Sequence, residues 1–277
     1  MQKTKIEWVK NLDGSQGYTW NPITGCLNGC PYCYARKLTN GRLRKIYLAN
    51  RITAPECRLD NLFADSHIRF ADPFYPRFWD DKCYEIVPQG KDKIKPHGVF
   101  VCDMSDLFGK GVPERWTSDV LDSIRRRPDW RFYLLTKQPQ NLIKWGPFPD
   151  NCWVGVSATD TMKFQSGTAY LHTVNAPVKF ISFEPLLDWQ MGADCMAEYL
   201  KERGINWIII GQQTPVKAST QPKIEWIQEI VEAADKVGLP VFLKYNLVEY
   251  IPVEEPFYKN DGTGWRIRQE FPTVEVK

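Results

Sequence analysis

The sequence predicts an α/β fold, a partial or complete parallel (β/α) barrel of about six to seven βα units. From about residue 98 onward, short apolar runs alternate with amphipathic stretches of helical length. Continuous apolar strands separated by helices are typical of a parallel sheet, because crossover helices bury both of its faces. The length of 277 residues is also close to that of a usual α/β barrel.

The predicted strands are these short apolar runs. They are expected at Thr19–Ile23, Gly98–Cys102, Arg131–Leu135, Cys152–Val156, Val178–Ser182, Asn206–Ile210 and Pro240–Leu243. The helices between them are expected at Pro113–Arg127, Gln138–Trp145, Thr161–Thr173, Ala193–Glu202 and Pro222–Val237. Pro at the first turn and Gly after the last turn of several of these stretches support the helix bounds.

Two segments do not follow the alternation. Residues 51–97 are rich in Pro, Asp and aromatic residues and show no clean periodicity, which predicts an irregular insertion after the first helix. Long excursions of this kind are often lids or binding loops. Residues 246–277 form an irregular, aromatic C-terminal tail. No linker composition separates these parts, so residues 1–277 are predicted to form a single domain.

Composition favours a protein of the cytoplasm. The first residues lack the apolar run of a signal peptide, and no apolar segment approaches the length of a membrane span. In a reducing compartment, the eight cysteines are expected to be metal ligands or core residues and not disulfides. Cys102, Cys152 and Cys195 fit as small core hydrophobes.

Three cysteines stand close together in the chain. Cys26, Cys30 and Cys33 have C-x3-C-x2-C spacing. A local triplet of thiolates can hold a four-iron cluster through three of its irons, which leaves the fourth iron without a protein ligand. An open coordination position is what a chemically active metal centre needs.

Two other metal sites are alternatives. A structural zinc site needs four ligands, and the nearest further candidates, Cys57 and His67, are not close to the triplet in sequence. Cys57 and Cys83 could hold an auxiliary cluster, although two cysteines with unrelated spacing are more often plain thiols.

Polar residues follow the predicted strands, where a parallel barrel has its active-site mouth. Among them, Glu184 and Lys244 have two possible roles. Either could anchor a substrate or transfer a proton, and equally the two could pair as a structural salt bridge, since ion pairs and catalytic groups look alike in sequence.

Positive charge is uneven along a chain whose net charge is only +3. A run of basic residues follows the cysteine triplet: Arg36, Lys37, Arg42, Arg44, Lys45 and Arg51. Such residues usually form solvated helix faces. The alternative is a docking surface for phosphates or for an acidic electron donor.

The triplet, with Tyr32 before its last cysteine and on the loop after the first strand, resembles the radical S-adenosylmethionine (SAM) superfamily. A wider set of short sequence segments resembles a phage- and prophage-associated branch of this superfamily, which is mostly described as a domain of unknown function. These segments are Thr4–Trp8, Trp20–Cys26, Asp103–Phe108, Leu135–Lys137, Phe183–Leu187 and Phe242–Lys244. Members of that branch usually carry extra residues between the first two cysteines, whereas this chain has the shorter spacing typical of the superfamily.

The resemblance implies a cofactor site. Cys26, Cys30 and Cys33 would ligate a [4Fe–4S] cluster, and SAM would chelate the fourth iron through its amino and carboxylate groups. Tyr32 would lie near the adenine of SAM.

Four further residues are implied as SAM contacts. Asp103 and Ser105 stand where the superfamily usually has a Gly-Gly-Glu-like sequence, so they would receive the SAM amino group through charge-assisted hydrogen bonds. Ser157 matches the polar position near the ribose, and Gln212 the position near the adenine.

The implied reaction is reductive cleavage of SAM to a 5′-deoxyadenosyl radical that abstracts a substrate hydrogen. The expected substrate is a (hyper)modified pyrimidine base in phage DNA, or a nucleotide, and isomerisation is favoured over lyase or transferase chemistry. A flavodoxin- or ferredoxin-like donor would supply the electron, in the host cytoplasm if a phage encodes the chain. The alternatives are a radical SAM enzyme acting on a peptide or protein side chain and a zinc-stabilised nucleic-acid-binding module without catalysis.

Overall fold

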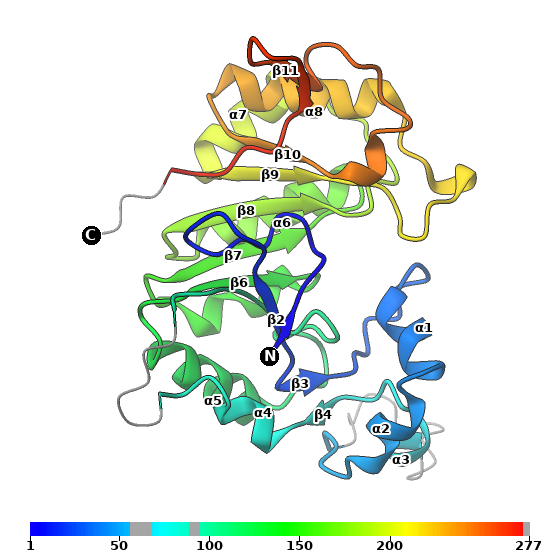
Figure 1. Cartoon of the computed structure of the whole chain (residues 1–277), viewed down its shortest axis with the longest axis vertical. Coiled ribbons are helices and arrows are strands. Elements are labelled where there is room, and N and C mark those ends of the chain that lie inside the picture. Colours follow the sequence, from blue (N-terminus) through cyan, green and yellow to red (C-terminus); the bar gives the residue numbers. More distant parts are fainter. Residues whose placement is uncertain (56–67, 89–94, 274–277) are drawn as a thin grey trace. The chain divides into compact units, whose positions relative to one another are not determined.

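A computed structural model describes residues 1–55, 68–88 and 95–273 of the chain (Figure 1). Cys57 and His67, the residues weighed as ligands of zinc or of an auxiliary cluster, lie outside the described residues. None of the described helices combines the length and the hydrophobicity of a membrane span.

The chain forms two compact units. Unit 1 comprises Met1–Asn141 and Pro149–Cys152, and unit 2 comprises Leu142–Phe148 and Trp153–Lys277. Each unit is an α/β structure with its own part of a mostly parallel sheet. The α/β class and the parallel strands are therefore confirmed, whereas closure into a barrel and the single domain stay predictions.

Unit 1 contains four strands in the order β1-β2-β5-β6: β1 (Gln2–Lys3), β2 (Tyr18–Trp20), β5 (Gly98–Val101) and β6 (Arg131–Thr136). β1 runs antiparallel to β2, and the other neighbours are parallel. α5 (Glu114–Arg125) makes the crossover from β5 to β6. Trp8, Trp20 and Phe132 are fully buried in this unit and supply much of its core.

The first predicted strand, Thr19–Ile23, is divided in two. β2 ends at Trp20, and the chain bends through Asn21 and Pro22 into β3 (Ile23–Thr24), which pairs antiparallel with β4 (Arg77–Phe78). Pro22 has no N–H to continue a ladder, so a strand break there is expected from its chemistry.

The cysteine segment and the insertion carry short helices that Figure 1 shows near β3 and β4. They are α1 (Tyr34–Asn40), α2 (Arg44–Ala49), α3 (Ile68–Ala71) and α4 (Asp80–Tyr84). The insertion is thus irregular with short helices and one short strand in its described part.

Unit 2 contains four parallel strands in the order β7-β8-β9-β10: β7 (Cys152–Ser157), β8 (Val178–Phe183), β9 (Trp207–Ile210) and β10 (Val241–Leu243). α6 (Thr161–His172), α7 (Ala193–Arg203) and α8 (Ile224–Lys236) follow β7, β8 and β9, and α7 lies beside α8 (Figure 1). This strand–helix alternation places residues 157, 184, 212 and 244 at or just after the carboxyl ends of neighbouring strands.

Two predicted elements differ from the structure. Residues 138–145 form two 3-10 turns, η2 (Pro139–Asn141) and η3 (Ile143–Trp145), in place of one helix, and Gly146–Pro147 follows at once. The tail contains an antiparallel hairpin of β11 (Tyr258–Asn260) and β12 (Trp265–Ile267). Buried Arg268 ties this hairpin to α8 through two hydrogen bonds to Asp235, of 2.8 and 2.9 Å.

Cys102, just after β5, has a left-handed backbone with φ of +62° and a buried side chain. Left-handed conformation costs a residue with a Cβ about 1–2 kcal/mol, and glycine avoids that cost. We therefore expect Cys102→Gly to be more stable than Cys102→Ala by about 1 kcal/mol in urea unfolding of the apoprotein.

Cys152, which is equally buried but lies in β7, is the matched control. There the order should reverse, with Cys152→Ala the more stable by about 0.5–1 kcal/mol, because glycine weakens a strand. If alanine is the more stable residue at both positions, the backbone of Cys102 is not under strain.

Candidate functional site

The cysteine segment runs from the end of β3 to α1, and Cys33 is the N-cap of that helix. All three cysteines are half-buried free thiols. The Cys33 N–H donates to the Cys30 carbonyl (3.1 Å), so one turn joins these two residues. The sulfurs of Cys26 and Cys33 accept backbone N–H groups of Asn28 and Arg36, each at 3.4 Å. N–H···S bonds of this kind orient and stabilise metal-bound thiolates.

The environment of Cys26 favours its neutral thiol unless a positive charge lies nearby. Burial raises the pKa of Cys26 to about 12, and Asp106, Cys30 and Cys33 also disfavour its thiolate. A bound metal centre supplies the positive charge that such a thiolate needs. Within the described parts of the chain, no three His, Cys, Asp or Glu side chains form a group that could hold one metal ion. In a four-iron cluster, by contrast, each cysteine binds a different iron.

The backbone around Cys26 is held from two directions. The Gly25 N–H donates to the Met104 carbonyl and the Cys26 N–H to the Phe74 carbonyl, both at 2.9 Å. Gly25 has φ of +84°, and a Cβ there would lie 2.3 Å from the Tyr75 carbonyl oxygen. Glycine is therefore required where the insertion presses against the first cysteine.

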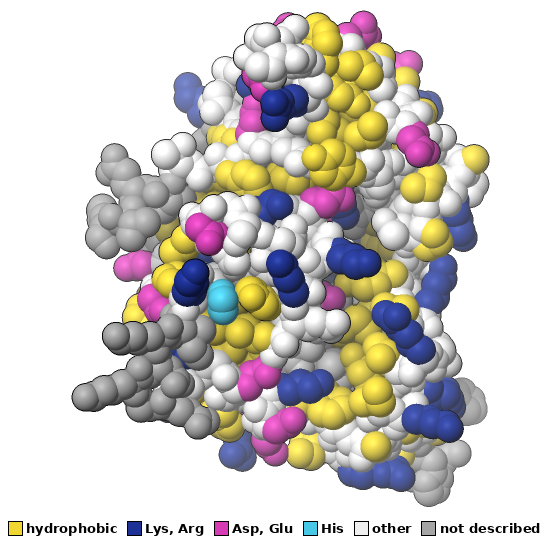
Figure 2. Space-filling model, viewed as in Figure 1, with side chains coloured by type: hydrophobic (Ala, Val, Ile, Leu, Met, Phe, Trp, Pro, Cys, Tyr) yellow, Lys and Arg dark blue, Asp and Glu magenta, His cyan; other side chains and the backbone are white. Residues whose placement is uncertain are grey.

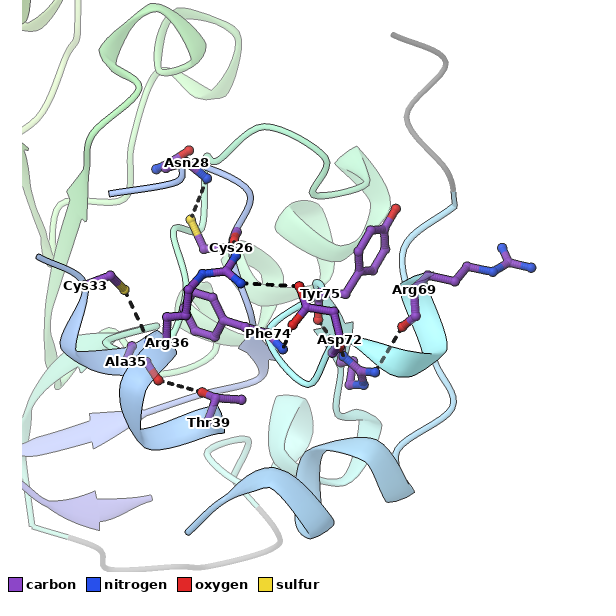
Figure 3. A network of polar contacts seen from close by, with 11 residues as sticks. Cys26, Asn28, Cys33, Ala35, Arg36, Thr39, Arg69, Asp72, Phe74 and Tyr75 are labelled. Carbon is purple, nitrogen blue, oxygen red and sulfur yellow. Dashed lines mark hydrogen bonds and ion pairs between the residues drawn. The ribbon is translucent and has the colours of Figure 1, made fainter. Parts of the chain in front are cut away.

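Arg36 on α1 joins Cys26 to the insertion (Figure 3). Its guanidinium lies over the Phe74 ring at 4.9 Å, donates to the Cys26 carbonyl at 3.3 Å and pairs with Asp72 at 3.4 Å. Sequence reasoning counted Arg36 as one charge of a basic run and missed this bridge. An arginine three residues after the last cysteine, on the helix that this cysteine caps, was the available signal.

Arg77 on β4 is a second arginine that sequence reasoning missed. Its side chain is almost fully buried and donates to four carbonyls, those of Asn50 (3.1 Å), Arg69 (3.0 Å), Asp72 (2.9 Å) and Tyr75 (2.8 Å). Burial lowers the pKa of this guanidinium below its usual range. Arg77 thus holds together the turn that contacts Gly25 and Cys26.

The two predicted SAM contacts after β5 lie against the cysteine segment. The Asp103 carboxylate accepts the Asn21 side-chain amide (2.5 Å), and the Tyr34 hydroxyl lies 2.9 Å from the Asp103 carbonyl and 3.4 Å from its carboxylate. Burial raises the pKa of Asp103 above its usual range. The Ser105 hydroxyl donates to the Gly25 carbonyl at 2.5 Å, so it helps to hold the cysteine segment.

Tyr32 is half-buried, and the Lys137 ammonium lies 5.9 Å from the centre of its ring. Lys137 directly follows β6, so the aromatic slot before the last cysteine lies near the carboxyl end of that strand. Unit 1 therefore brings Tyr32, Asp103 and Ser105 together around the triplet.

Unit 2 holds the other four predicted site residues. Ser157 is buried at the end of β7 and is in register with Ser182 of β8. The Gln212 side-chain amide donates to the Asn246 carbonyl, and the Asn246 amide donates to the Gln212 carbonyl at 2.8 Å. The Oε1 atom of Gln212 is buried, and no described residue donates to it. A buried acceptor without a donor is costly, which makes Gln212 a candidate ligand contact.

Glu184 and Lys244 form an ion pair. Lys244 Nζ lies 2.6 Å from Glu184 Oε2, with side chains 16% and 19% exposed, and Ser182 donates to Glu184 Oε1 at 3.2 Å. A Cβ at Gly211 would lie 2.8 Å from Cδ of Lys244, so this glycine leaves room for the lysine stem. The ion pair, one of the two alternatives that the sequence left open, is present; a role in catalysis stays a prediction.

Substitution of Lys244 distinguishes an ion pair that only stabilises the fold from an ion pair that acts on substrate. If the pair acts on substrate, Lys244→Met should lower the rate of substrate turnover by at least about 100-fold, as expected for a lost proton-transfer or anchoring group. If the chain cleaves SAM as the sequence resemblance implies, formation of 5′-deoxyadenosine without substrate should stay within about twofold. Loss of both rates in proportion to thermal stability would show a structural pair.

The basic residues after the triplet lie on the surface of unit 1. Arg42, Arg44 and Lys45 are exposed, and Figure 2 shows Lys and Arg side chains over the region of α1 and α2. Arg36 is engaged with Asp72 and Cys26 and is not part of this surface. Cys102 and Cys152 are buried as predicted, whereas Cys195 on α7 is exposed, contrary to the expectation of a core residue.

Comparisons with known proteins give one family and two structural likenesses. The pattern of a family described as "protein of unknown function (DUF5131)" matches residues 3–262. Among curated proteins no sequence matches.

Both structural likenesses are to spore photoproduct lyase. One is the lyase complexed with dinucleoside spore photoproduct, at 11% identity and a TM-score of 0.44, covering 91% of this chain and 68% of the lyase chain. The other is a double mutant with bound AdoMet and dinucleoside spore photoproduct, at 10% identity and a TM-score of 0.42, covering 88% and 64%. Likeness at this level does not extend to activity.

Proposed function

The chain belongs to the DUF5131 family, and we propose that it is a radical SAM enzyme. The observation that carries the proposal is the cysteine triplet at C-x3-C-x2-C spacing, half-buried and fixed by backbone hydrogen bonds. Three thiolates match a [4Fe–4S] cluster with one open iron. When bound, the cluster and SAM would supply a 5′-deoxyadenosyl radical that abstracts a hydrogen atom from the substrate.

The residues of unit 1 would hold the cofactors. Cys26, Cys30 and Cys33 would bind three irons. Asp103 would accept the SAM ammonium, because a carboxylate held by Asn21 and Tyr34 presents its oxygens in a fixed direction.

The predicted site residues of unit 2 have proposed roles of their own. Ser157 would bind the ribose, and the unsatisfied Oε1 of Gln212 would accept a hydrogen bond from the adenine amino group. Glu184 and Lys244 would anchor the substrate, and Lys244, already beside a carboxylate, could pass a proton without leaving its place.

The proposed substrate is a modified pyrimidine base in DNA or in a nucleotide, and the proposed reaction is its modification or isomerisation. The exposed basic residues of α1 and α2 support a partner with negative charge. Closure of the strands into a radical SAM barrel is part of the proposal, because it would enclose the radical and exclude water.

Anaerobic purification followed by incubation with SAM and dithionite tests the proposed function. We expect a brown protein with about four irons per chain that releases 5′-deoxyadenosine. A colourless protein that binds zinc and forms no 5′-deoxyadenosine would rule the proposal out and favour the zinc-stabilised nucleic-acid-binding module.

The proposed docking of an acidic electron donor is tested separately, by substitution of Arg42, Arg44 and Lys45. Changing all three to glutamate should slow reduction by a flavodoxin by at least about tenfold at low salt, because an acidic donor would be repelled. Reduction by dithionite is the control and should stay unchanged. Equal flavodoxin rates for the variant and the original chain would show that the donor docks elsewhere.

A further inference from the structure

Asp106 is a buried carboxylate that the proposed mechanism does not use. Asp106 is 5% exposed, and the two oxygens of its carboxylate accept four hydrogen bonds. Oδ1 accepts the Thr136 hydroxyl (2.7 Å) and the Phe108 N–H (3.2 Å). Oδ2 accepts the Asn28 side-chain amide (2.9 Å) and the Lys137 N–H (3.0 Å). Four donors match the ionised form of a carboxyl group, which only accepts hydrogen bonds.

These four donors tie the cysteine segment to the sheet of unit 1. Asn28 stands between Cys26 and Cys30, and Thr136 and Lys137 mark the end of β6. Asn28 is also held from its other side, because the Gln138 side-chain amide donates to its Oδ1. Asp106 thus fixes the middle of the C-x3-C stretch relative to β6.

The charge of Asp106 is near the metal-binding sulfurs. Asn28 links the two groups, because its side-chain amide donates to Asp106 Oδ2 at 2.9 Å and its backbone N–H donates to the Cys26 sulfur at 3.4 Å. The four hydrogen-bond donors to Asp106 are neutral groups, so they orient the carboxylate and offset its negative charge only in part. A charge in a buried, low-dielectric setting acts on its neighbours more strongly than one in water.

We propose that Asp106 is a positioning residue that holds the cysteine segment and lowers the reduction potential of the cluster bound there. This inference rests on the proposed function. Adding an electron beside a fixed negative charge is unfavourable, and net charge and burial are among the factors that set the potentials of iron–sulfur clusters.

The test is the midpoint potential of the SAM-free cluster, followed by electron paramagnetic resonance in a redox titration, with iron per chain measured alongside. Asp106→Asn should make the potential more positive, because it removes the charge and keeps the shape. Asp122→Asn on α5 is the matched control, since this carboxylate is exposed and pairs with Arg125. It should leave the potential unchanged.

A second variant tests the effect of the Asp106 charge while the carboxylate itself stays in place. Thr136→Val removes one donor to Asp106 and leaves its charge less compensated, so the potential should become more negative. If Asp106→Asn cannot retain a cluster, Thr136→Val decides the matter, and an unchanged potential there overturns the inference. An unshifted potential in Asp106→Asn with about four irons overturns it as well. If the original chain binds no cluster, the proposed function and this inference both fall.

Discussion

Replacing Cys30 with alanine is expected to remove nearly all iron from the protein and to abolish the formation of 5′-deoxyadenosine. A cluster held by three thiolates has no spare protein ligand, so losing one of them leaves two irons without protein support. The measurements are iron per chain and visible absorbance after anaerobic reconstitution, with 5′-deoxyadenosine followed by chromatography.

Cys195→Ala is the control for this result. Cys195 is an exposed thiol on α7, and the same chemical change there should leave iron content and SAM cleavage within about 20% of the original values. A Cys30→Ala protein that keeps about four irons would show that the triplet is not the cluster site.

Arg77→Met is expected to destabilise unit 1 by at least about 3 kcal/mol and to lower its retention of iron. The variant leaves four carbonyls without their shared donor, and a buried acceptor that loses its partner costs about 1–3 kcal/mol. The free energy of unfolding in urea, followed by tryptophan fluorescence, measures the loss.

Arg44→Met, at an exposed position on α2, is the matched control and should change stability by less than about 0.5 kcal/mol. Arg77→Lys should recover part of the loss, because an ammonium reaches fewer carbonyls than a guanidinium. A loss below about 1 kcal/mol in Arg77→Met would mean that the turn is held mainly by its apolar contacts.

Local hydrophobic runs were sufficient to predict β5 to β10, since each of these strands is a short apolar segment between helices. The helix predicted at 138–145 was wrong, because periodicity did not reveal that Gly146 and Pro147 follow two short turns. β1 and the hairpin of β11 and β12 were missed, because short strands with exposed polar residues carry little pattern.

The parts of the candidate site that could be predicted are those whose functional residues stand close together in the sequence or directly after a predicted strand. The cysteine triplet needs only its spacing to be recognised, and Glu184 and Lys244 stood out as ionisable residues after strands. The partners of Arg36 and Asp106 could not be assigned in this way, because several of them lie far away in the chain. Asp106, for example, meets Asn28 across a separation of 78 residues.

The contact between Gly25 and the turn at residues 72–78 limits which parts of the chain can be deleted. Phe74 and Tyr75 supply the carbonyls that meet Cys26 and Gly25, and Arg77 anchors that turn. A deletion that reaches residues 72–78 would therefore remove contacts that hold the cysteine segment. Variation in length during evolution, and any engineered minimal version, should spare this stretch even though it belongs to no long helix or strand.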